Sequence, residues 1–141
     1  MDHSKPYPEG YIAEILDSVR TIAVVGASPR ENRPSYIVMQ TLLDAGFDAI
    51  PVNPYGGDLI LGKSVYASLS DVPEPIDMVD VFRRNEAVMS VVEDVIAAGV
   101  KIIWTQLGVV DAKAAEVAEA AGVKVVMNRC PRIELARLDR L

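Results

Sequence analysis

Five short apolar runs, each closed by a turn-forming residue or a loop, constrain the fold of this chain more than any other feature. The first, residues 21–25, reads Thr-Ile-Ala-Val-Val, as expected for a strand buried on both faces. The other runs occupy residues 47–52, 78–82, 100–104 and 123–127. Segments with helical spacing separate most of these runs. The alternation predicts one α/β domain with a parallel sheet and helices on both of its faces.

The expected helices are defined by the spacing of their apolar residues and by their ends. They cover residues 10–20, 34–45, 85–98, 111–121 and 131–138. Pro34 and Pro131 suit the first position of a helix, and Asn85 and Asp111 are expected N-caps. Ligands bind where the order of such strands reverses, and we place the first strand there. We therefore expect a Rossmann-like, doubly wound, five-stranded sheet with strand order 3-2-1-4-5.

The length of 141 residues indicates one domain, residues 1–141, with a polar N-terminal arm over residues 1–9 that holds His3 in solvent. No apolar run reaches the ~18 residues that a membrane span needs, and no signal-peptide pattern is present. The single cysteine, Cys130, fits a reducing compartment. The net charge of −6 argues against general nucleic-acid binding. We expect a cytoplasmic protein without a membrane or nucleic-acid partner.

The turn after the first strand is the first candidate binding element. Gly26, Ala27, Ser28 and Pro29 are small or turn-forming, and a predicted helix begins at Pro34. Backbone N–H groups in such a turn, together with the dipole of the following helix, stabilise an anion. Ordinary strand–helix turns also use these residue types, so the turn alone leaves both interpretations open.

Basic residues gather in the loops after the strands, which share one edge of a parallel sheet. Seven of the fourteen Lys and Arg residues lie there: Arg30, Arg33, Lys63, Arg83, Arg84, Arg129 and Arg132. Acidic residues in the same loops are fewer. Because α/β sheets hold ligands at this edge, the pattern favours a small-molecule polyanion with several phosphates.

The fingerprint of dinucleotide-binding proteins is incomplete. Only Gly26 remains of its three glycines, and the second strand ends in Asn53-Pro54 without the carboxylate that binds the adenine ribose. NAD is therefore disfavoured. NADP is less disfavoured, because Arg33 could meet a 2′-phosphate. A Walker A loop is absent, so ATP hydrolysis has no support.

Five short motifs at the strand ends resemble a known family when they are taken together. They are AVVGAS at residues 23–28, PVNP at 51–54, VFR at 81–83, IWTQLG at 103–108 and NRCP at 128–131. In this order they resemble the small single-domain CoA-binding proteins, which are similar to the N-terminal domain of the succinyl-CoA synthetase alpha subunit. The resemblance covers residues 19–134 and implies coenzyme A or an acyl-CoA as the ligand.

The resemblance also implies the residues that contact the ligand, from the phosphate-holding turn to the thiol end. They are Gly26, Ala27, Ser28, Pro29, Arg33, Asn53, Pro54, Phe82, Arg83, Ala87, Trp104, Thr105, Gln106 and Cys130. The family often has a lysine soon after Val-x-Pro, where this chain has Tyr55. Lys63 or Arg33 is expected to supply that charge. Trp104, in an apolar strand, is expected in the core rather than stacked on adenine.

No catalytic set is evident in the sequence. Asp77 and Asp80 are three residues apart around the third strand, so they do not form an acid–base pair. Cys130 is either a small buried hydrophobe or a reactive thiol near the thiol of CoA. The phosphoryl-transfer histidine of the synthetase belongs to a second domain that the resemblance does not cover, so ligase activity is not implied.

The predicted function is therefore the binding of CoA or acyl-CoA without evident catalysis, in order to sense or present the ligand. Two enzymes remain as alternatives: an NADP-linked oxidoreductase, and a CoA-dependent enzyme that needs a partner chain. A third alternative is an interaction module that has lost its ligand. A homodimer or a partner protein is left open.

Overall fold

A five-stranded parallel sheet forms the centre of the computed structural model, which describes residues 1–141. In chain order its strands are β1 (Thr21–Val25), β2 (Asp48–Val52), β5 (Met78–Val81), β6 (Ile102–Thr105) and β7 (Lys124–Val126). All neighbouring strands pair in parallel. The continuous apolar runs form strands because helices cover both of their faces, which confirms the predicted α/β class.

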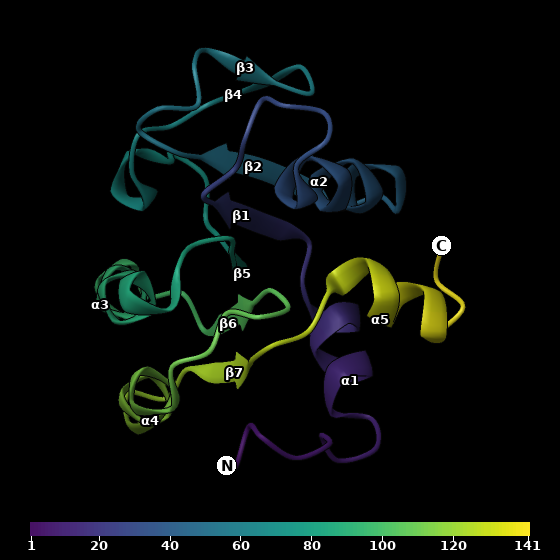
Figure 1. The fold of residues 1–141 in the computed structure, drawn as a ribbon, viewed down its shortest axis with the longest axis vertical. Coiled ribbons are helices and arrows are strands. Elements are labelled where there is room, and N and C mark those ends of the chain that lie inside the picture. The colour runs from purple at the N-terminus through teal and green to yellow at the C-terminus, as the bar shows by residue number, and fades with distance from the viewer.

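Helices lie on both faces of the sheet (Figure 1). One face carries α1 (Tyr11–Ser18), α2 (Pro34–Asp44) and α5 (Pro131–Arg137), and the other carries α3 (Val88–Ala98) and α4 (Ala112–Ala120). Because side chains alternate along a strand, each face has its own hydrophobic cluster. In β5, Val79 and Val81 face α3 and α4, whereas Met78 faces α1, α2 and α5. None of the helices is both long enough and apolar enough to cross a membrane.

The smaller elements lie between β2 and α3. They are the antiparallel pair β3 (Leu59–Ile60) and β4 (Lys63–Ser64), and the 3₁₀ turns η1 (Leu69–Asp71) and η2 (Asn85–Ala87). The β3–β4 pair lies beyond β2, at the end of the molecule opposite to α4 (Figure 1). The connection from β2 to β5 therefore holds β3, β4 and η1 in place of the α-helix that usually joins two parallel strands, and η2 follows β5.

The expected strand order 3-2-1-4-5 is wrong. The observed order is β2-β1-β5-β6-β7, so the third strand of the sheet pairs with β1 rather than with β2. The carboxylate of Asp77, just before β5, accepts hydrogen bonds from the backbone N–H groups of Arg20 and Thr21 at 2.9 Å each. These contacts fix the start of β5 beside the start of β1. The order reverses between β1 and β5, so β1 still lies at the switch point.

Most of the expected helix ends are confirmed, and one N-cap is wrong. The side chain of Asp111 accepts the N–H of Ala114 at 3.0 Å and caps α4 as expected. Asn85 does not cap the long helix, because it begins the 3₁₀ turn η2 and α3 starts at Val88. The Oδ1 atom of Asn85 instead accepts the N–H of Val110 at 2.9 Å. Asn85 therefore braces the loop that follows β6.

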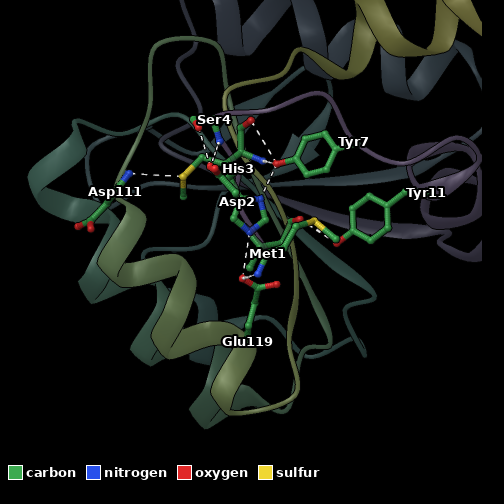
Figure 2. Close-up of polar contacts among 10 residues, drawn as sticks. Met1, Asp2, His3, Ser4, Tyr7, Tyr11, Asp111 and Glu119 are labelled. Carbon is green, nitrogen blue, oxygen red and sulfur yellow. Dashed lines mark hydrogen bonds and ion pairs between the residues drawn. The ribbon is translucent and has the colours of Figure 1, made fainter.

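The N-terminal arm packs beside β7, the edge strand of the sheet. The Tyr7 hydroxyl accepts the N–H of Met127 at 2.7 Å, and the Tyr11 hydroxyl donates to the carbonyl of Val125 at 2.8 Å (Figure 2). Partial burial raises the pKa of each of these two phenols above the ordinary tyrosine value of 10.0. The two tyrosines thus occupy backbone groups that an uncovered edge strand leaves free for association with another chain.

The expectation that His3 is a solvated tail residue is wrong. Its side chain is only 6% exposed. Its ring nitrogens lie 2.7 Å from the Tyr7 hydroxyl and 3.0 Å from the Glu119 carboxylate of α4 (Figure 2). The arm is therefore fastened to α4 as well as to β7.

Replacing Tyr7 by phenylalanine is expected to lower the free energy of unfolding by about 1–2 kcal/mol, because the Met127 N–H loses its acceptor in a partly buried site. Urea unfolding of the two proteins measures the difference. Tyr55→Phe is the matched control, since Tyr55 is 91% exposed. Equal losses in the two variants would contradict a specific role for the Tyr7 hydroxyl.

Candidate functional site

Two adjoining pockets lie at the carboxyl ends of the strands, where the strand order reverses between β1 and β5. They share Gly26, Phe82 and Arg83. We call the pocket beside α2 the basic pocket and the pocket beside α3 the α3-side pocket. Their volumes are about 550 Å³ and 390 Å³ respectively. Open α/β sheets bind ligands at this position.

Gly26 lets β1 end in close contact with the end of β5. Its φ angle is +89°, and a Cβ atom here would overlap the carbonyl oxygen of Phe82 and lie 2.9 Å from the carbonyl carbon. The Phe82 N–H donates to the carbonyl of Val25 at 2.8 Å, which keeps the two strand ends together. Only glycine combines this conformation with this approach. Gly26 thereby forms a wall common to both pockets.

Two serine hydroxyls shape the turn after β1. The Oγ atom of Ser35 accepts the N–H of Ser28 at 3.0 Å, and the Oγ atom of Ser28 accepts the N–H of Arg30 at 3.2 Å. These two N–H groups are therefore already used within the protein, unlike the free donors that the turn was expected to offer. Ser35 lies in the first turn of α2, and the N-terminus of a helix of this length favours a negative charge.

Four arginines line the basic pocket: Arg30, Arg33, Arg83 and Arg84. None of their guanidinium groups takes part in a salt bridge or a hydrogen bond within the protein, and the ion pairs of this chain use other residues. Four unpaired guanidinium groups thus meet at one concave site of a protein with a net charge of −6. Arginine binds phosphate groups with paired, charge-assisted hydrogen bonds.

The other three residues of the expected basic edge lie elsewhere. Lys63 pairs with Asp48 at 3.1 Å, at the amino end of β2 and therefore at the opposite edge of the sheet. The guanidinium of Arg129 lies over the Tyr7 ring, 4.9 Å from its centroid. Arg132 lines neither pocket. The predicted set of seven is reduced to four, and Lys63 does not replace the lysine of the family pattern.

The α3-side pocket is more apolar than its neighbour, with hydrophobic residues making up 7 of the 14 that line it. Asn53 ties its loop to the turn after β1. The Nδ2 atom donates to the carbonyl of Ala27 at 2.8 Å, and the Oδ1 atom accepts the N–H of Tyr55 at 2.9 Å. Asn53 thus has a structural role at the position where dinucleotide enzymes carry a ribose-binding carboxylate.

The loop after β6 brings Gln106 and two apolar residues into the basic pocket. Side chains from the end of β6 and from the loop after β7 hold it in place. Asn128 Oδ1 accepts the N–H of Gly108 at 2.7 Å, and the Thr105 hydroxyl donates to the carbonyl of Val109 at 2.7 Å. Sites held on braced loops keep their side chains oriented before a ligand arrives.

Eight of the fourteen predicted contact residues line the two pockets: Gly26, Ser28, Arg33, Asn53, Pro54, Phe82, Arg83 and Gln106. Six line neither pocket: Ala27, Pro29, Ala87, Trp104, Thr105 and Cys130. Trp104 is fully buried and its Nε1 donates to the carbonyl of Arg129 at 2.9 Å, which confirms the core interpretation. Cys130 is 7% exposed and packs in the hydrophobic cluster beneath α2 and α5, as the buried-hydrophobe interpretation predicts.

Several lining residues were missed as ligand contacts. Arg30 was placed at the basic edge only, and Ser35, Ser90 and Asp94 were not considered. A signal existed for Ser35, because a serine one residue after a helix-starting proline is well placed to bond the preceding turn. The α3 residues carry no comparable signal, since they follow the ordinary polar face of a helix.

The carboxyl of Asp80 is buried in the sheet, outside both pockets. Asp80 lies in β5 between Val24 and Trp104, is 0% exposed, and neither of its oxygens has a hydrogen-bond partner. Burial holds the pKa of this carboxyl well above its ordinary value of 3.8. Asp80 lines neither pocket, and no group of three or more His, Cys, Asp or Glu side chains is arranged to hold a metal ion.

The fold and the site define a small Rossmann-like α/β domain with a basic crevice at its switch point. The chain belongs to the CoA binding domain family, whose model matches residues 20–136. The family resemblance seen in the five sequence motifs is thereby confirmed.

The chain is also similar to individual proteins and solved structures. The protein YneT of Bacillus subtilis is 38% identical over 122 residues, which cover 86% of this chain and 90% of YneT. A solved structure of a hypothetical protein from Pyrococcus horikoshii has a TM-score of 0.88 and 38% identity, and covers 98% of this chain and 99% of that one. The alpha subunit of ADP-forming acetate–CoA ligase I from Pyrococcus furiosus is 32% identical over 95 residues. That match covers 64% of this chain but only 21% of the ligase subunit.

Proposed function

We propose that this protein binds coenzyme A or an acyl-CoA in the two adjoining pockets, in the cytoplasm, and senses the ligand or presents it to a partner. The observation that carries the proposal is the group of four unpaired arginines in the basic pocket of a CoA binding domain. The positive charge has no counterpart within the protein, so an anionic ligand gains the full interaction.

The chemistry of the ligand matches the difference between the pockets. Coenzyme A carries a pyrophosphate and a 3′-phosphate, which suit the arginines and the first turn of α2. Its adenosine has a flat apolar base with polar edges, which suits the α3-side pocket between Pro54 and Val91. Arg33, the N-cap of α2, is the candidate to replace the missing family lysine, because Lys63 is paired at the opposite edge.

Calorimetric titration tests the proposal with CoA, dephospho-CoA, NADP and NAD at one low salt concentration. Arg33→Ala and Arg83→Ala are each expected to weaken CoA binding about 10- to 100-fold, because each removes a charge-assisted phosphate contact. Arg132→Ala is the control, since this exposed arginine lines neither pocket, and it is expected to change the affinity less than about twofold.

Each other outcome identifies a different function. Binding of NADP without CoA would indicate the NADP-linked oxidoreductase. Binding of none of the four ligands would indicate an interaction module, and the basic pocket would then face a protein. Equal weakening of CoA binding by Arg33→Ala and Arg132→Ala would show that general charge, not the pocket, attracts the ligand.

A CoA-dependent enzyme that needs a partner chain is the second candidate function. The matched region is only 21% of the ligase alpha subunit, so in that relative the rest of the reaction machinery lies outside the match. Leu107 at the rim of the basic pocket is 51% exposed, and an apolar rim suits contact with another protein. Co-purification of a CoA-dependent enzyme with the tagged protein, lost in Leu107→Asp but not in Leu59→Asp, would support this function.

A further inference from the structure

The side chain of Arg129 joins the N-terminal arm to the loop after β7. Its Cζ atom lies 4.9 Å from the centroid of the Tyr7 ring, and the face of an aromatic ring attracts a cation at this distance. Its Nη1 atom donates to the carbonyls of Met127 and Asn128 at 3.3 Å and 2.9 Å, and its Nη2 atom donates to the carbonyl of Lys5 at 3.5 Å. One guanidinium group thus contacts both the arm and the backbone of the loop.

The arm that contacts Arg129 is itself fixed at several points. Tyr7 stacks on Tyr11 with 5.3 Å between the ring centroids, and its hydroxyl accepts the N–H of Met127. The buried side chain of His3 lies between the Tyr7 hydroxyl and α4 (Figure 2). The ring beneath Arg129 therefore has a defined position.

The loop after β7 in turn holds one wall of the basic pocket. The Oδ1 atom of Asn128 accepts the N–H of Gly108 at 2.7 Å, and the N–H of Asn128 donates to the Thr105 hydroxyl at 3.1 Å. Gly108 lies between Leu107 and Val109, which both line the pocket. Asn128 is thus the link between the loop after β7 and the pocket wall.

This link depends on the backbone conformation of Asn128. Its φ angle is +60°, in the left-handed region that residues with a Cβ atom seldom adopt. The carbonyls of Met127 and Asn128 belong to the peptide groups on the two sides of this residue, and both accept hydrogen bonds from Arg129. Arg129 therefore fixes both peptide groups, and with them the direction of the Asn128 side chain.

We infer that Arg129 is a positioning residue through which the N-terminal arm holds the loop after β6 in the conformation that completes the basic pocket. Neither the arm nor Arg129 lines the two pockets, so the arm sets the affinity of the site without touching the ligand. Release of the arm frees Asn128 and loosens the pocket wall. The effect on affinity rests on the proposed function, whereas the effect on the loop does not.

Amide hydrogen exchange of the ligand-free protein tests the positioning directly, because two amides of the same loop have different partners. The N–H of Gly108 is held by Asn128, whereas the N–H of Val110 is held by Asn85 at 2.9 Å. In Arg129→Ala, exchange at Gly108 is expected to accelerate at least about tenfold, while exchange at Val110 stays within about twofold of the wild type.

Calorimetric titration with CoA measures the consequence for the pocket. Arg129→Ala is expected to bind CoA about 5- to 10-fold more weakly, because a loosened wall must be ordered again when the ligand binds. Arg140→Ala is the matched control, since it removes an arginine that bonds Asp17 instead. This control is expected to change neither the exchange rates nor the affinity by more than about twofold.

Two variants of Tyr7 separate positioning from stability. Tyr7→Leu removes the ring beneath the guanidinium and is expected to reproduce both effects of Arg129→Ala. Tyr7→Phe keeps the ring and loses the hydroxyl contacts, so it is expected to lower stability while CoA affinity stays within about twofold of the wild type. Thermal unfolding checks the fold of each variant, and Tyr7→Leu takes the place of Arg129→Ala if the latter does not fold.

The outcomes separate this inference from the proposed function. Unchanged exchange at Gly108 in Arg129→Ala would overturn the inference, whether or not CoA binds. Equal acceleration at Gly108 and Val110 would also overturn it, because the loop would then follow general stability rather than Asn128. Faster exchange at Gly108 with unchanged CoA affinity would overturn the connection to the pocket. Failure of the wild type to bind CoA would reject the proposed function alone, and exchange at Gly108 would still decide the role of Arg129.

Discussion

Replacing Gly26 by alanine is expected to destabilise this protein by on the order of 3–5 kcal/mol, a large part of the stability of a domain of this size. Two physical effects add. The φ angle of +89° strains any residue with a Cβ atom, and the added methyl group would overlap the carbonyl oxygen of Phe82. Relief requires β1 and β5 to separate at the hydrogen bond from Phe82 to Val25.

Gly122→Ala is the matched control for the conformational part of this effect. Gly122 has a φ angle of +83°, and a Cβ atom there would meet no atom within 4 Å. Its replacement is expected to cost about 1 kcal/mol. Urea unfolding followed by circular dichroism measures both variants. Similar losses for the two would show that the contact between β1 and β5 yields without strain, contrary to the packing described above.

Gly26→Ala is also expected to affect ligand binding more than stability alone predicts. Gly26 lies between the two pockets, and Phe82 and Arg83 line both of them. A shift of β5 away from β1 displaces these residues relative to the turn after β1. CoA affinity measured well below the melting temperature of the variant separates this effect from unfolding.

The strands and helices could be predicted from the sequence because their signals are local. Apolar runs, proline at the start of a helix and glycine at its end act within a few residues. The strand order could not, because it depends on a contact between residues far apart in the chain. Asp77 bonds the backbone of Arg20 and Thr21 across 57 and 56 positions respectively. The position of His3 likewise depends on Glu119, 116 residues away.

Only part of the candidate site could be predicted, because a motif at the end of a strand does not show which of its side chains reach a pocket. A motif at the end of a strand contains residues that alternate between the two faces of the sheet, and a motif alone does not say where the strand stops. Trp104 and Gln106 point to the same face, but Trp104 is covered by helices whereas Gln106 lies beyond them and reaches the pocket. Lys63 does not reach the pockets because it pairs with Asp48, the first residue of β2. The PVNP motif lies at the opposite end of the same strand, where the pockets are.

Replacing Asp80 by asparagine is expected to stabilise the protein increasingly as the pH rises above about 4. Asp80 is 0% exposed between Val24 and Trp104, and burial raises the pKa of its carboxyl well above 3.8. Below pH 4 the carboxyl is neutral in the folded and the unfolded chain, and the pH has no effect through this group. Above pH 4 the unfolded chain releases its proton while the folded chain retains it, which favours unfolding by up to about 1.4 kcal/mol per pH unit.

This loss continues until the pH passes the pKa of Asp80 in the folded protein, and then becomes constant. Asparagine has nearly the same shape as aspartate and does not ionise. The variant therefore does not lose stability through this position at any pH in the range. The measurement is the free energy of unfolding of both proteins in urea between pH 4 and pH 9. Asp58→Asn, at an exposed carboxylate, is the control and is expected to leave the pH profile unchanged. If the stability difference between Asp80→Asn and the wild type does not grow with pH, the ionised carboxylate must gain a partner in the folded protein. The neighbouring residues Val24 and Trp104 offer none, because the Nε1 of Trp104 already donates to the carbonyl of Arg129.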